Sequence, residues 1–198
     1  MNEKKKRLLI TDTYRTLGFI IRSSHTFRQI DTIILLYYSF VRSKLEYASA
    51  VWNCSTATQI NNLEKVQKKF LRYIYYRKHG VYPHYSRHPV RTRDMQREFK
   101  ILSLENRRNL TDALFLHKLC NNLIDCPNLL FSVNFHAPER ITRHKALFYS
   151  PLEKQVRLSS PMHRLQDLYN TLNDHLDLDL CMSLNIFKKS VTEYYSSL

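Results

Sequence analysis

Hydrophobic residues recur at helical spacing in the first half of the chain. Between residues 28 and 46 they follow one another at intervals of three and four, which predicts an amphipathic helix. A second helix is predicted over residues 58–76, with Thr58 as its N-cap. The apolar positions of the first helix are Ile30, Ile33, Ile34, Tyr37, Tyr38, Val41 and Leu45, and those of the second are Ile60, Leu63, Val66, Phe70 and Ile74.

The second predicted helix also carries a basic stripe. Lys65, Lys68, Lys69 and Arg72 recur at i, i+3, i+4 and i+7, so they share one face. That face lies about 180° from the apolar one on a helical projection. One helix therefore presents its apolar side to a core and its cationic side to solvent or to an anionic partner.

The remainder of the chain predicts more helices around an irregular segment. Gly80, Pro83 and Pro89 end the second helix in a basic, aromatic loop. Helical patterns resume over residues 91–100, 103–123, 161–174 and 181–195. Four prolines between residues 127 and 161 predict an irregular connector, with room for a short hairpin. We expect a mainly α fold, a helical bundle followed by this connector and C-terminal helices, divided into a basic region 1–90 and a C-terminal region 91–198.

Positive charge is concentrated in one part of the sequence. The formal net charge is +14, and residues 65–100 alone hold 11 Lys and Arg against 2 Asp and Glu. Such a concentration predicts an anion-binding surface. Tyrosines that can stack on bases are interleaved with these cations, which is typical of nucleic-acid binding. They are Tyr73, Tyr75, Tyr76, Tyr82 and Tyr85.

Two other interpretations of this basic region stay open. The cations can form a solvated helix face while the tyrosines pack on the core. An acidic membrane surface is less favoured, because the strip lacks exposed apolar anchors.

Glycine and cysteine usage exclude several classes of enzyme. The chain has only two glycines, Gly18 and Gly80, so neither a Walker loop nor a dinucleotide-binding fingerprint is present. No serine or cysteine has the local context of a nucleophile. Cys120, Cys126, His136 and His144 lack the paired spacing of zinc ligands. We therefore predict no catalytic residue, no metal site and no cofactor, and we interpret Asp174, Asp177 and Asp179 as solvated carboxylates around a helix break.

The N-terminal residues do not predict export or membrane insertion. Three apolar residues, Leu8 to Ile10, are too few for a signal-peptide core. The apolar run of residues 33–41 is about half the length that spans a bilayer. We expect a nuclear or cytoplasmic protein, in which residues 4–7 act as an import signal or as a solvated basic tip.

Several blocks of sequence resemble one family of polyproteins. Residues 36–52, LYYSFVRSKLEYASAVW, and the block from Ile60 to Arg72 are similar to consecutive stretches of non-LTR (LINE-type, jockey-like) retrotransposon reverse transcriptases. Residues 102–108, 124–127 and 160–170 resemble later elements of the same polyproteins in the same order. The resemblance covers about residues 17–190.

The resemblance implies a helical thumb that follows the polymerase palm and grips the template–primer backbone. The chain has no Asp-Asp pair, which the family's palm uses to hold metal ions, so the resemblance implies a non-catalytic fragment. Its partner would be RNA or an RNA–DNA hybrid, and the palm and fingers of the parent polyprotein are further candidates. The expected phosphate contacts are Lys65, Lys68, Lys69 and Arg72, with Arg42, Lys44, Arg77 and Lys78 as additions.

Two alternatives accompany this interpretation. The helical stripes can instead dock on the absent palm or another protein without binding nucleic acid, which predicts exposed apolar area beside residues 8–45. Glu46 and Trp52 can orient an arginine and stack on nucleic acid, or they can form a structural corner between two helices.

Overall fold

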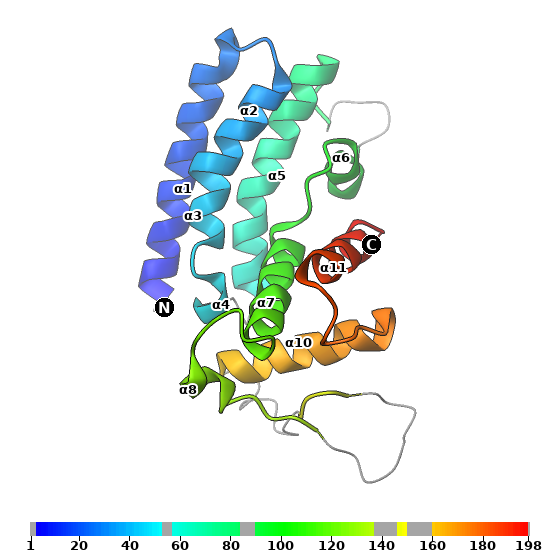
Figure 1. Ribbon diagram of the computed structural model, residues 1–198. Helices are drawn as coiled ribbons and strands as arrows, with labels where there is room; N and C mark the ends of the chain where they lie inside the picture. Colours follow the sequence, from blue (N-terminus) through cyan, green and yellow to red (C-terminus); the bar gives the residue numbers. More distant parts are fainter. Residues whose placement is uncertain (1–2, 53–56, 84–89, 137–145, 150–159, 198) are drawn as a thin grey trace. The chain divides into compact units, whose positions relative to one another are not determined.

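The computed structural model describes residues 3–52, 57–83, 90–136, 146–149 and 160–197 (Figure 1). Within these ranges the protein is mainly α-helical, which confirms the predicted fold class. Two compact units are present. One comprises Met1–Ser49 with Cys54–Arg107, and the other Ala50–Asn53 with Arg108–Leu198. The division proposed from sequence at residue 90 follows the end of the basic region, whereas the first unit continues to Arg107 because α6 contacts α5.

The first unit is a bundle in which α1, α2 and α5 lie side by side (Figure 1). The predicted helix over residues 28–46 is present from residue 30 as α2, a π-helical segment and α3. The elements are α1 (Glu3–Ser23), α2 (Ile30–Tyr37), the π-helical segment (Tyr38–Arg42), α3 (Ser43–Glu46), α5 (Ala57–His79) and α6 (Thr92–Glu98).

α1 was not among the predicted helices. Its buried residues Thr13, Leu17 and Ile20 recur at helical spacing, and Ser24 is buried in the 3-10 turn that follows (Ser24–Thr26). The Thr13 hydroxyl donates a hydrogen bond to the Leu9 carbonyl at 2.6 Å, which removes the cost of burying it.

The π-helical segment has a cause in the spacing of the core residues. Ile33, Tyr37, Val41 and Leu45 are all fully buried and stand four residues apart. In a regular α-helix such positions rotate by about 40° at each step, because a turn takes 3.6 residues. The wider π turn between residues 38 and 42 holds the four side chains on one face.

A buried polar chain crosses the core of the first unit. The Tyr37 ring stacks on Phe70, with centroids 3.9 Å apart, and its hydroxyl donates to Gln67 Oε1 at 3.0 Å. Gln67 Nε2 in turn donates to the Leu102 carbonyl at 2.8 Å. Because each buried group has a partner, the chain fixes the register of α2, α5 and the segment before α7.

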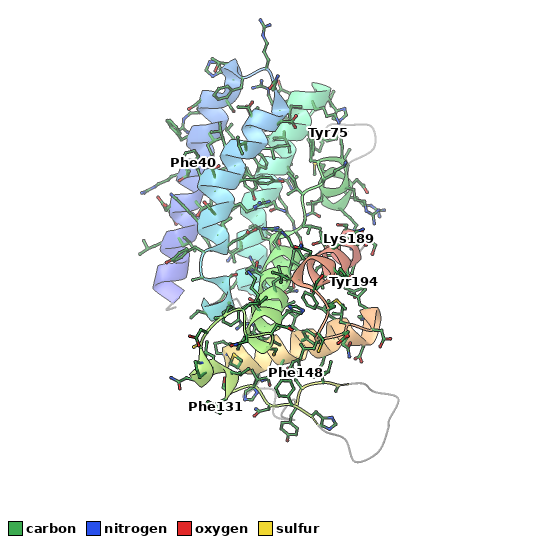
Figure 2. The ribbon with its side chains drawn as sticks, in the orientation of Figure 1. Phe40, Tyr75, Phe131, Phe148, Lys189 and Tyr194 are labelled. Atoms are coloured by element: carbon green, nitrogen blue, oxygen red, sulfur yellow. The ribbon has the colours of Figure 1, made fainter. Side chains whose placement is uncertain are left out.

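The second unit contains most of α4, most of α7 and the helices that follow α7. Its core is aromatic: Tyr169 is stacked on Phe187 and meets Phe148 edge-on, with centroids 5.2 Å apart in the latter pair. Figure 2 shows Phe148 beside α10. The helices of this part of the chain are α4 (Ser49–Trp52), α7 (Leu104–Cys120), α8 (Pro127–Leu130), α10 (Pro161–Leu176) and α11 (Leu184–Ser197).

The described parts of the connector are short and irregular. α8 begins directly at Pro127, and the backbones of Phe135 and Phe148 form an isolated antiparallel bridge. Asn170 of α10 holds this bridge, since its Oδ1 accepts from the Leu147 and Phe148 amides at 3.1 Å. Downstream, α10 ends where Asp177 adopts a left-handed conformation, which is the helix break predicted there.

Candidate nucleic-acid interface

α5 separates an apolar face from a basic face, as its sequence predicts. Leu63, Val66, Phe70 and Ile74 are buried in the core of the first unit. Lys65 and Lys69 are exposed, and Lys68 and Arg72 are half-buried on the other side of the helix. The four cations therefore lie together on one outward-facing strip.

The four cations line a hollow of about 400 Å³ on the surface of the first unit. Its wall is completed by Tyr14 from α1 and Tyr82 from the segment after α5. The Lys69 Nζ lies 5.7 Å from the centroid of the Tyr14 ring, within the range of a cation–π interaction. Sequence reasoning missed Tyr14, because it lies on a helix that was not predicted.

Tyr82 reaches the hollow because the chain reverses direction after α5. Gly80 has φ +73°, and its amide donates to the Tyr76 carbonyl at 2.8 Å, which ends the helix. The following residues fold back, and the ring of Tyr82 lies 5.1 Å from that of Tyr76. Tyr76 stands four residues beyond Arg72, so this aromatic pair continues the basic strip of α5.

The cations of the hollow are not neutralised by acids within the described part of the chain. None of the four forms an ion pair there, and the Lys65 ammonium donates only to the Asn62 side chain, at 3.2 Å. Four positive charges on two turns of helix repel one another, so an anion that bridges them is favoured.

Arg42 and Lys44, two of the additional predicted contacts, are held by groups of their own unit. Arg42 lies over the Tyr38 ring at 3.5 Å and forms an ion pair with Glu46 at 3.5 Å. The Lys44 ammonium donates to Asp12 at 2.8 Å. Neither residue lines the hollow.

Arg77 and Lys78, the other two additions, have partners as well. Arg77 donates to the carbonyls of Ser24 and Phe27 at 2.9 and 2.6 Å, and so fixes the turn after α1 to α5. Lys78 donates to Glu98 of α6 at 2.7 Å. These contacts hold both side chains within the fold.

The predicted stacking tyrosines divide into two groups. Tyr73 is buried, and its hydroxyl is hydrogen-bonded to that of Ser24 at 2.7 Å. Tyr75 is half-buried and meets the ring of His79. Tyr76 and Tyr82 are both 42% exposed. Tyr85 lies outside the described residues.

Other residues that carry the family resemblance lie at contacts between helices. Arg107 binds Glu46 through two hydrogen bonds of 3.0 Å. Glu64 is buried and accepts the Glu105 amide at 2.9 Å in the first turn of α7, where the helix dipole favours a carboxylate. Glu46 thus orients arginines within the fold, and the side chain of Trp52 lies outside the described part.

No cluster of three or more His, Cys, Asp or Glu side chains in the described residues is arranged to hold a metal ion. Burial raises the pKa of the Cys120 thiol to about 11, which opposes its ionisation. His144 lies outside the described residues. No helix of the described chain has the length and apolarity needed to cross a membrane.

No protein-family model, curated protein or solved structure matches this chain.

Proposed function

We propose that this protein binds the sugar–phosphate backbone of RNA or of an RNA–DNA hybrid through the basic face of α5. The observation that carries the proposal is the hollow itself, in which Lys65, Lys68, Lys69 and Arg72 converge without an acidic partner among the described residues. Phosphate contacts release counterions and carry little sequence information, so binding should be strongly salt-dependent and weakly sequence-selective.

The resemblance in sequence supports a more specific proposal for this activity. We propose that the chain is the thumb-like, C-terminal part of a non-LTR retrotransposon reverse transcriptase, acting in the nucleus or cytoplasm. In that setting the chain contributes grip on the template–primer and no chemistry of its own. The separate faces of α5 support this role, because one side anchors the helix while the other stays available to a polyanion.

A charge-reversal experiment tests the assignment of the face. We expect the double variant K68E/R72E to bind a 20-base-pair RNA–DNA hybrid at least about tenfold more weakly than the parent in a filter-binding titration at moderate salt. The matched control is K188E/K189E on α11, which changes the net charge equally at two exposed positions.

The control should bind within about twofold of the parent, and far-UV circular dichroism should show unchanged helicity for both variants. Equal affinity of K68E/R72E and the parent would reject the proposal. Equal losses in both double variants would also reject it, since net charge rather than this face would then govern binding.

A second candidate function is a protein-interaction module, and exposed apolar side chains favour it. Leu8 and Phe19 of α1 are 62% and 65% exposed, and Leu35 and Phe40 along the α2–α3 helix are 63% and 54% exposed. Phe40 is labelled in Figure 2. Exposed apolar side chains in this number are typical of surfaces that another protein covers, such as the palm of the parent polymerase.

The variant F19S/F40S tests the interaction surface. If these side chains are covered by another protein in use, the isolated chain should associate with itself through them, and the variant should raise the monomeric fraction in size-exclusion chromatography. An unchanged elution profile would count against an interaction surface on these helices.

A further inference from the structure

We propose that the hollow on α5 seats one unpaired nucleotide, with its base against the Tyr82 and Tyr14 rings and its phosphate on the neighbouring cations. This inference rests on the proposed function and specifies its ligand. It assigns the site to the junction between a duplex and a single strand, rather than to a continuous duplex.

The shape of the site is the first argument. In a continuous duplex the bases are stacked inside the helix, so only the sugar–phosphate backbone can contact the hollow. The hollow has a volume of about 400 Å³, which lies in the range of pockets that accept small ligands. A single nucleotide has the right size for such a space, whereas a base held in a duplex stack cannot enter it.

The aromatic residues are the second argument. Tyr14 and Tyr82 come from segments far apart in the sequence and meet at the same hollow as the four cations. Tyr82 is partly supported by Tyr76 and remains 42% exposed. Rings presented beside cations are the arrangement with which proteins bind unpaired bases, because every base has a face that stacks.

The position of the cations is the third argument. Lys68 and Arg72 are one helical turn apart, and Lys69 contacts the Tyr14 ring, so cationic groups and aromatic rings lie within one small site. A single nucleotide carries both a phosphate anion and an aromatic base, and it is small enough for both to contact this site. The positive φ of Gly80 allows the turn after α5 that brings Tyr82 to the site. The Tyr82 ring is therefore in position before a ligand binds.

The test compares three ligands of equal total nucleotide number: a blunt RNA–DNA hybrid, a shorter hybrid whose single-stranded overhang makes up the difference, and a single strand. We expect the parent to bind the overhang ligand about tenfold more tightly than the blunt one, through the stacking of one base. Y82L should lose this preference while still binding the blunt hybrid. Y82F, the matched control, should keep it because the ring remains.

A direct readout uses 2-aminopurine, a fluorescent base, at the first unpaired position. Stacking on Tyr82 should quench its emission when the parent or Y82F binds, and less so with Y82L or Y14L. Equal affinity of the parent for blunt and overhang ligands, or equal quenching by Y82L and Y82F, would overturn the nucleotide seat.

The charge variant separates this inference from the proposed function. If K68E/R72E binds all three ligands as the parent does, the proposed function fails and the nucleotide seat fails with it. If K68E/R72E loses all three ligands while the parent shows no overhang preference, backbone binding stands and the nucleotide seat alone is rejected.

Discussion

Arg107 donates two parallel hydrogen bonds to Glu46, from Nε to Oε1 and from a terminal nitrogen to Oε2, each 3.0 Å long. The pair joins the end of α3 to the first turn of α7 within the same unit. Its side chains are only 17% and 28% exposed, so solvent screens the interaction weakly. The hydrogen bond to Glu46 raises the pKa of Arg107.

Breaking this pair should destabilise the first unit without changing the hollow. We expect E46Q to lower the free energy of unfolding by about 1–2 kcal/mol, between the values for exposed and for fully buried pairs. A double-mutant cycle of E46Q and R107Q in urea denaturation measures the coupling. A coupling near zero would show that the two residues act independently.

The salt dependence of binding should distinguish the cations of the hollow from those paired within the fold. Four phosphate contacts predict a slope of log Kobs against log salt of about −3, since each contributes about 0.7–0.9. K68Q and R72Q should each make that slope shallower by about 0.7–0.9, the contribution of one phosphate contact. K44Q is the control, because the Lys44 ammonium already bonds Asp12 and Thr16. A slope change in K44Q equal to that in K68Q would contradict this distinction.

The two glycines predict stability changes of opposite sign. G80A should lower the free energy of unfolding by about 1 kcal/mol, because an alanine at φ +73° is strained although its Cβ would meet no atom within 4 Å. G18A should raise it by about 0.5–1 kcal/mol, since Gly18 lies within a helix and its nearest neighbour is the flexible end of Arg22, 3.4 Å away. Thermal unfolding of both variants measures the two effects, and a stabilised G80A would contradict the assigned role of Gly80.

His117 should make the protein less stable as the pH falls. Burial lowers the pKa of His117 below its ordinary value of 6.5, and a hydrogen bond with the Met182 carbonyl opposes this only in part. The unfolded chain therefore binds a proton near pH 6.5 that the folded chain does not, so stability declines below that pH. The decline amounts to at most about 1.4 kcal/mol per pH unit and ends below the folded-state pKa.

The variant H117Q isolates this contribution from that of the other histidines. Urea denaturation of parent and variant between pH 7.5 and 5 should show a smaller loss of stability in H117Q. Parallel pH profiles of the two proteins would show that His117 does not titrate differently in the folded state.

The sequence predicted the fold where helices have one strongly apolar face. The helices around residues 28–46 and 58–76 are present, because their apolar residues recur at the helical period. It did not predict α1, and it could not show that Ser24, in the turn after α1, is buried against the Tyr73 hydroxyl of α5. The π-helical segment was not predicted either: the four-residue spacing of Ile33, Tyr37, Val41 and Leu45 is present in the sequence, but only the fold shows that all four are buried in one core.

For the candidate interface, what the sequence could predict depends on how far apart in the chain the interacting residues lie. The opposite apolar and basic faces of α5 follow from the sequence alone, because the helical period fixes which neighbours within one helix share a side. Only the tertiary structure decided which cations meet an acid, and which aromatic rings join Lys68 and Arg72. The partners of Lys44 and Lys69 lie on α1, and sequence spacing says nothing about where two distant helices touch.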